Sequence, residues 1–125
     1  AISGAITPTA ASSKIFVSIF YIAAVSNTGS TLAAGEAKIY QDIDSGGYAA
    51  LFPSAVGNLS FRNVGASGDN QLRAYQTITY LDSPSYTLTD VITYKLYGVT
   101  TTGWGTFYIC PDSDSASIIL MEVAA

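Results

Sequence analysis

The stretch SKIFVSIFYIAAV, at residues 13–25, decides which class of fold this sequence predicts. Read with the two-residue period of a β-strand, it places two largely apolar sets of side chains on opposite faces. One set is Ile15, Val17, Ile19, Tyr21 and Ala23, and the other is Phe16, Ser18, Phe20, Ile22 and Ala24. An antiparallel strand with one wet side normally keeps that side polar. We therefore expect a hydrophobic core on one face of this strand and a second cover on the other.

The same period continues along the chain, and no long segment shows the 3.6-residue period of an amphipathic helix. Clusters of Gly, Ser, Asn and Asp separate the apolar runs, as turns do. The expected strands cover residues 2–7, 13–25, 36–43, 48–52, 59–64, 71–81, 91–99, 107–110 and 117–123. About eight or nine strands at this spacing predict an all-β sandwich, jelly roll or barrel. Residues 91–110 further predict a hairpin, because a glycine-bearing loop joins two aromatic-rich strands.

The size and composition of the chain indicate a single domain, residues 1–125, whose surface needs an additional cover. The sequence is 49% hydrophobic and 11% charged, whereas roughly 25% charged residues are usual in soluble proteins. Such a chain can bury a core, but it has too few charges to cover a monomer in the ordinary way. Either Ser, Thr, Asn and Gly form the wet surface, or a partner covers apolar area.

Charge and residue usage exclude several classes of function. The net charge of −4 offers no means of neutralising phosphates, so we expect neither nucleic-acid binding nor attachment to anionic membranes. The absence of His excludes a Ser–His–Asp triad and a His-ligated metal, and no cofactor is expected. Only residues 15–25 are persistently apolar, short of the roughly 20 that a membrane-spanning helix needs. Cys110 is the single cysteine, so we expect a small buried residue and no intrachain disulfide.

Four motifs, in this order, resemble a domain of tailed-phage and marine-virus structural proteins. They are GAITPTAASSKI at residues 4–15, YLDSP at 80–84, TYKLY at 93–97 followed by GTFYI at 105–109, and ASIILMEVA at 116–124. The sequence departs from the family pattern at Cys110, where the family usually has Asn. Residues 41–70 match none of its motifs.

The resemblance implies the C-terminal β-structured module of a longer virion fibre protein, located on the virion surface. Such modules are similar in outline to tumour-necrosis-factor-like jelly rolls, which are homotrimers. The resemblance therefore makes the expected fold an antiparallel jelly-roll sandwich. A homotrimer would also supply the cover that the second face of residues 15–25 requires.

The function expected from these observations is non-enzymatic adhesion by a fibre tip or receptor-binding module. Its expected partners are copies of itself, other virion proteins, and a glycan or protein of the host surface. A second hypothesis is a capsid decoration or head-fibre protein that covers the shell. A third is a carbohydrate-active hydrolase, which would require an acid pair such as Asp82 and Asp90. Asp82 precedes Ser83 and Pro84, so a local turn explains the presence of an Asp at this position without catalysis.

Two sets of candidate residues follow for the interfaces. For the trimer interface we expect Phe16, Phe20, Ile22 and Glu122. Glu122 lies in an otherwise apolar strand, so we expect a cation to pair with it. For ligand binding we expect aromatic residues in or beside loops, since their rings offer rigid area and a polar tip. These are Tyr48, Phe52, Tyr86 and Trp104, although packing at subunit borders is an alternative role for them.

Two Asp-x-Asp turns are candidate metal sites. Asp42 and Asp44 precede a glycine pair, and Asp112 and Asp114 flank a serine. Carboxylates at alternate positions of a turn can converge on Ca²⁺, but the further ligands of an EF-hand are missing. Solvated turns, in which Asp bonds its own backbone, are the alternative.

Overall fold

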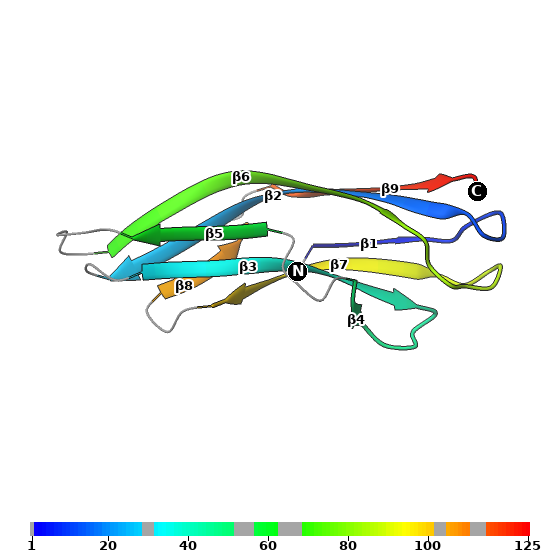
Figure 1. Cartoon of the computed structure of the whole chain (residues 1–125), viewed down its shortest axis with the longest axis horizontal. Helices are drawn as coiled ribbons and strands as arrows, with labels where there is room; N and C mark the ends of the chain where they lie inside the picture. The colour runs from blue at the N-terminus through cyan, green and yellow to red at the C-terminus, as the bar shows by residue number, and fades with distance from the viewer. Residues whose placement is uncertain (1, 29–31, 52–56, 63–68, 102–104, 111–114) are drawn as a thin grey trace.

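Nine β-strands make up the part of the chain that the structure describes, and this part contains no helix (Figure 1). The structure, a computed structural model, describes residues 2–28, 32–51, 57–62, 69–101, 105–110 and 115–125. The strands are β1 (Ile2–Ile6), β2 (Lys14–Thr28), β3 (Leu32–Ile43), β4 (Ala49–Ala50), β5 (Gly57–Arg62), β6 (Asp69–Asp82), β7 (Ile92–Thr100), β8 (Gly105–Ile109) and β9 (Ser117–Val123). Within these ranges, no helix of the length and apolarity needed to cross a membrane is found. The prediction of an all-β chain is confirmed, and each expected run overlaps one of these strands.

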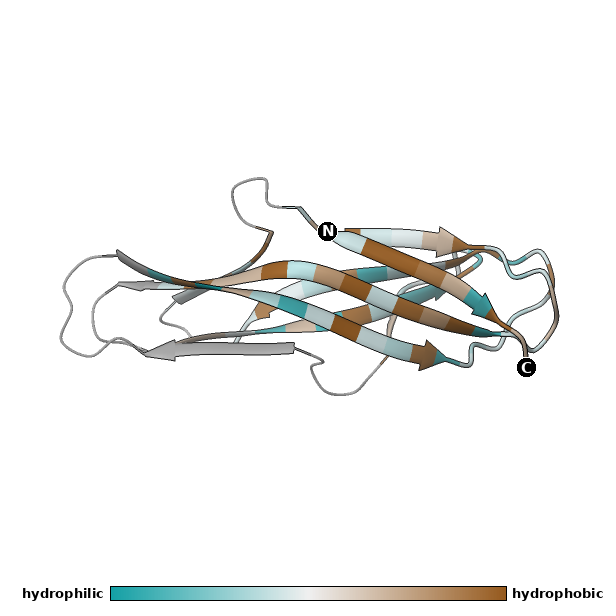
Figure 2. Cartoon of the chain, turned by 90° about the horizontal axis from the view of Figure 1, so that it is seen from above, coloured by the Kyte–Doolittle hydropathy of each residue, from teal (hydrophilic) through white to brown (hydrophobic). Residues whose placement is uncertain are grey.

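The strands form two antiparallel sheets that pack face to face (Figures 1 and 2). The five-stranded sheet has the order β1-β7-β3-β4, and β5 also pairs with β3. In the four-stranded sheet, β6 follows β2 along nearly its whole length. The other edge of β2 is shared by β9, along Lys14–Phe20, and β8, along Ala23–Asn27. β2 is therefore the central strand of its sheet.

The core lies between the sheets and takes alternate residues from the strands on both sides. The first predicted face of β2 is fully buried: Ile15, Val17, Ile19, Tyr21 and Ala23. Opposite it, the five-stranded sheet contributes Ala33, Ala37, Ile39, Ile92, Tyr94 and Leu96. The predicted division of β2 into two faces is confirmed, because only one of them enters this core.

The expected hairpin over residues 91–110 is wrong, because β7 and β8 belong to different sheets. One edge of β7 is occupied by β3, and β1 occupies the other edge from Ile92 to Leu96. β8 instead pairs with β2 and packs Phe107 onto Gly35 and Gly98. A Cβ added at Gly35 would lie 2.1 Å from the Phe107 ring, so a side chain there would collide with it. These two glycines let β8 lie across the opposite sheet.

Candidate functional site

The outer face of the four-stranded sheet is apolar. Phe16 and Ile22 of β2 are half-buried there, and Phe20 is 36% exposed. The register places further large side chains beside them on β6, β8 and β9. We call the set the apolar face: Phe16, Phe20, Ile22, Tyr75, Leu81, Tyr108, Ile119 and Met121. Figure 2 shows how apolar positions recur along the strands of the sandwich.

Several members of the apolar face are largely open to solvent in the single chain. Tyr75 is 78% exposed, and its ring stacks on Phe20 with centroids 6.1 Å apart. Ile119 and Met121 are 58% and 53% exposed. Among the side chains that the structure describes on this side of the sheet, the charged ones, Lys14 and Arg73, lie toward its two ends. The middle of the sheet therefore presents apolar and uncharged polar groups.

Sequence reasoning found the β2 members of the apolar face and missed those of the neighbouring strands. The sequence shows four of these as large side chains in expected strands: Tyr75, Leu81, Ile119 and Met121. Which face of the sheet they occupy depends on how their strands pair with β2. The register sets Met121 and Leu81 opposite Phe16 and Tyr75 opposite Ile22. That register is a property of the folded sheet and not of one segment.

Glu122 lies on the other side of β9 from the apolar face. It pairs with Ile15, whose side chain is in the core, and its carboxylate turns to the loop before β2. The backbone N–H groups of Thr9 and Ala10 donate to it at 2.9–3.0 Å, and the Thr9 hydroxyl donates at 2.8 Å. The expected cationic partner is therefore replaced by backbone and hydroxyl donors. These bonds hold the pKa of Glu122 well below its usual range, at about 2.

Two of the four aromatic candidates are described, and they differ in role. The Tyr86 hydroxyl donates to the carbonyl oxygens of Ala10 at 2.7 Å and Ser13 at 3.3 Å, so its polar tip fastens the same loop. Tyr48, just before β4, is 39% exposed, with the Lys95 ammonium 3.9 Å from its ring centroid. Phe52 and Trp104 lie outside the described residues.

The described Asp-x-Asp turn makes one local hydrogen bond and one backbone hydrogen bond to a distant segment. The Gly47 N–H donates to Asp42 at 2.8 Å, and the Asp44 N–H donates to the carbonyl of Val91 at 2.9 Å. Within the described ranges, no group of three or more His, Cys, Asp and Glu side chains is placed to hold a metal ion. Asp112 and Asp114 lie outside those ranges.

The two carboxylates of the hydrolase hypothesis make structural hydrogen bonds. Asp82 is 5% exposed and accepts from the Tyr94 hydroxyl at 2.6 Å and from the Gln41 amide. Asp90 accepts from the backbone N–H and the hydroxyl of Thr87. The local turn expected for Asp82 is therefore wrong, because its partners come from the opposite sheet. Asp82 connects the two sheets through a buried polar contact.

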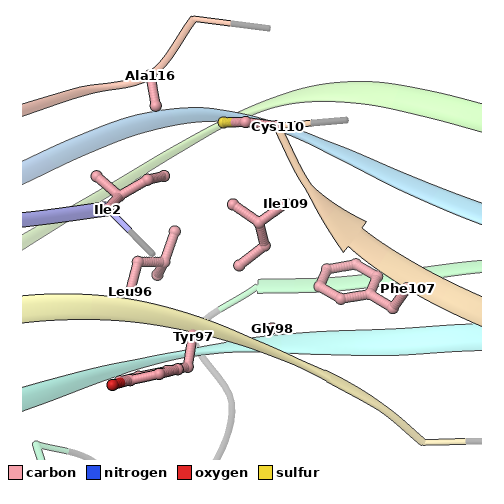
Figure 3. A pocket seen from close by; sticks show the side chains of 8 residues that line it. All are labelled: Ile2, Leu96, Tyr97, Gly98, Phe107, Ile109, Cys110 and Ala116. Atoms are coloured by element: carbon pink, nitrogen blue, oxygen red, sulfur yellow. The ribbon is translucent and has the colours of Figure 1, made fainter. Parts of the chain in front are cut away.

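A cavity of about 450 Å³ opens at the edge of the sandwich, beside β7 (Figure 3). Its apolar lining comes from both sheets, with Ile2 and Leu96 on one side and Ile109 and Cys110 on the other. Gly98 contributes backbone alone, and Tyr97, Phe107 and Ala116 complete the lining. This cavity could not be predicted from the sequence, because its walls are segments far apart in the chain.

No family model, no curated protein and no solved structure matches this chain.

Proposed function

We propose that this chain is a non-enzymatic structural domain that assembles with two copies of itself through the apolar face. The observation that carries the proposal is the exposure of large apolar side chains across the middle of one sheet, Tyr75 and Ile119 above all. Large exposed apolar patches mark interaction sites, and identical chains assemble for the most part with closed symmetry. A threefold arrangement of jelly-roll sandwiches is the assembly that the resembling virion modules use.

The proposed place of work is the surface of a virion, in a fibre protein. The four motifs that resemble virion structural proteins support this assignment. They span both sheets of the sandwich, since residues 4–15 lead from β1 into β2 and residues 116–124 include β9. Assembly through the apolar face suits a fibre, whose subunits run side by side.

We further propose that the module adheres to a glycan or a protein of the host surface. Covering the apolar face leaves the outer face of the five-stranded sheet free, and that face carries Tyr48, Tyr97 and Lys95. The Tyr97 ring packs edge-on against Tyr40 at 5.2 Å. Exposed tyrosines beside an ammonium group offer ring faces and hydrogen-bond donors to a ligand.

A glycan array tests the adhesion proposal. We expect the assembled protein to bind a defined group of glycans, and Tyr48→Ala to weaken that binding without changing the assembly. Leu88→Ala is the matched control, because Leu88 is also open, at 50% exposed against 39% for Tyr48, and lies in the β6–β7 connection. If the Tyr48→Ala and Leu88→Ala variants bound the glycans equally well, the result would contradict a role for this face in adhesion. Release of sugar from any array member would favour the hydrolase instead.

A further inference from the structure

A polar pocket lies at the end of the sandwich where the β1–β2 loop meets the β6–β7 connection (Figure 1). Its volume is about 370 Å³, at the lower end of the range of ligand pockets. Both walls are internal segments, residues 12–14 and 83–86, and the residues on either side of them in the chain are described as well. We call it the serine pocket, and its lining is Ser12, Ser13, Lys14, Ser83, Pro84, Ser85 and Tyr86.

The charge of the serine pocket favours an anionic ligand. Lys14 is the one charged side chain in its lining. Two carboxylates from neighbouring strands are bound elsewhere, Glu122 to the β1–β2 loop and Asp82 to the opposite sheet. Among the described residues, no carboxylate forms an ion pair with Lys14. The chain has nine acidic and five basic residues, so a pocket lined by a cation and by no carboxylate stands apart from the rest of its surface.

Serine hydroxyls form most of the other polar lining. Ser12, Ser83 and Ser85 are exposed, and within the described part of the chain their hydroxyls make no hydrogen bond to another residue. A hydroxyl both donates and accepts, as the hydroxyls of a sugar do. Pro84 and Tyr86 are partly buried and add carbon surface, against which the ring of a sugar can pack.

One wall of the serine pocket is fixed before any ligand binds. The Tyr86 hydroxyl donates to the carbonyl oxygens of Ala10 and Ser13, and Glu122 accepts from the Ala10 N–H. Ser12 has a φ of 66°, a left-handed conformation that residues other than glycine rarely adopt without support from their surroundings. A site that is already ordered loses less conformational entropy when its ligand binds.

We propose that the serine pocket binds a sugar that carries a carboxylate, with the carboxylate at the Lys14 ammonium and the sugar hydroxyls at the serines. A bond between an ammonium and a carboxylate is charge-assisted and therefore strong for its size. An inorganic anion would leave the carbon surface of Pro84 and Tyr86 unused. The inference goes beyond the proposed function, because the pocket belongs to one chain and its lining includes neither Tyr48 nor a member of the apolar face.

An NMR titration of the isotope-labelled protein tests the inference. The probes are the methyl glycosides of glucuronic, galacturonic and N-acetylneuraminic acid, each compared with its methyl ester, which lacks the charge. We expect at least one of the three acids to cause saturable shifts of the backbone amide signals of Ser12 and Ser85. Its ester should bind about tenfold more weakly, through loss of a charge-assisted bond.

Three variants assign the binding to the pocket. Lys14→Gln should weaken binding of the acid to the level of its ester. Arg73→Gln is the matched control, because it removes the same charge from the far end of the same sheet and should leave binding unchanged. Ser12→Gly removes a lining hydroxyl where glycine suits the backbone, so it should weaken binding of both acid and ester without lowering the melting temperature.

Several results would overturn the inference. One is the absence of saturable shifts with all three acids, and another is equal affinity for acid and ester. Equal effects of Lys14→Gln and Arg73→Gln would mean that the Lys14 ammonium is only solvated. Inorganic phosphate that binds as tightly as the sugar acid would make the pocket a general anion site instead.

The same titration separates this inference from the proposed function. The shifts should persist in Tyr75→Asp, whose charge lies in the apolar face, and in Tyr48→Ala. Shifts in a protein that stays monomeric, or that binds nothing on the glycan array through Tyr48, would contradict assembly or adhesion alone. A trimer that binds the array through Tyr48 but gives no shifts would contradict the serine pocket alone.

Discussion

At the scale of single residues, Glu122 holds a loop in place without a cation. Its carboxylate accepts from the N–H groups of Thr9 and Ala10 and from hydroxyl groups of Thr9 and Ser13. Each of these bonds favours the charged form, and so the pKa falls. Tyr86 fastens the same loop from the other side through Ala10 and Ser13. The chain entering β2 is therefore fixed by two side chains from distant segments.

This arrangement predicts how stability depends on pH. The pKa of Glu122 falls from 4.5 to about 2 on folding, so its bonds stabilise the fold fully above pH 4.5. That stabilisation is lost progressively as the pH falls toward 2. We expect Glu122→Gln to lower the melting temperature at pH 7 and to change it much less at pH 2. Thermal melts followed by circular dichroism at both pH values measure this. An equal loss at both pH values would show that the charge of Glu122 is irrelevant.

Gly35 gives a second prediction at this scale. An added Cβ would meet the Phe107 ring at 2.1 Å, so Gly35→Ala should destabilise the fold by about 3 kcal/mol through overpacking. Adding Phe107→Ala should recover part of that loss, because it removes the colliding ring. Urea denaturation of the two single variants and the double variant measures the coupling between them. Strictly additive losses would mean that the ring does not fill the space at Gly35.

At the scale of elements, the sequence was informative about strands and uninformative about their partners. β2 could be predicted with both of its faces because its own alternation carries the information. The separation of β7 from β8 could not, since it depends on β8 pairing with β2, a strand far away in the chain. Asp82 was misread for the same reason: its bonds reach Tyr94 and Gln41 in the other sheet.

The hydrogen bond between Asp82 and Tyr94 joins the two sheets, and we expect it to contribute to the free energy of unfolding. Burial, and then the bond to Asp82, raise the pKa of Tyr94, so its hydroxyl stays protonated and donates. Tyr94→Phe should cost about 1–3 kcal/mol, because it leaves a buried carboxylate short of a donor. Tyr97→Phe is the control, since Tyr97 is 40% exposed on the outer face. Urea denaturation compares them, and equal small effects would show that the contact contributes little.

At the scale of the whole molecule, the two outer faces of the sandwich differ in kind. The four-stranded sheet presents the apolar face, with Tyr75 at its most open point. The five-stranded sheet presents Glu36, Lys38, Tyr40 and Lys95. The alternation in β2 predicted this asymmetry in part, through Phe16, Phe20 and Ile22. The rest of the apolar face and the cavity beside β7 require the folded register.

The asymmetry predicts that a charge has different effects on the two faces. Tyr75→Asp should dissociate the assembly, because it places a carboxylate in the middle of the apolar face. Tyr97→Asp places the same group on the opposite sheet and should leave the assembly intact. Sedimentation velocity compares the two variants, and circular dichroism checks that both remain folded. Dissociation by both, or by neither, would contradict the assignment of the interface.

Static light scattering on the unaltered chain, from high to low concentration, tests the proposed self-association most directly. We expect a particle of three chains of 13.0 kDa that persists on dilution. A folded particle of one chain at every concentration would contradict it, because the side chains of Tyr75, Ile119 and Met121 would then be facing water.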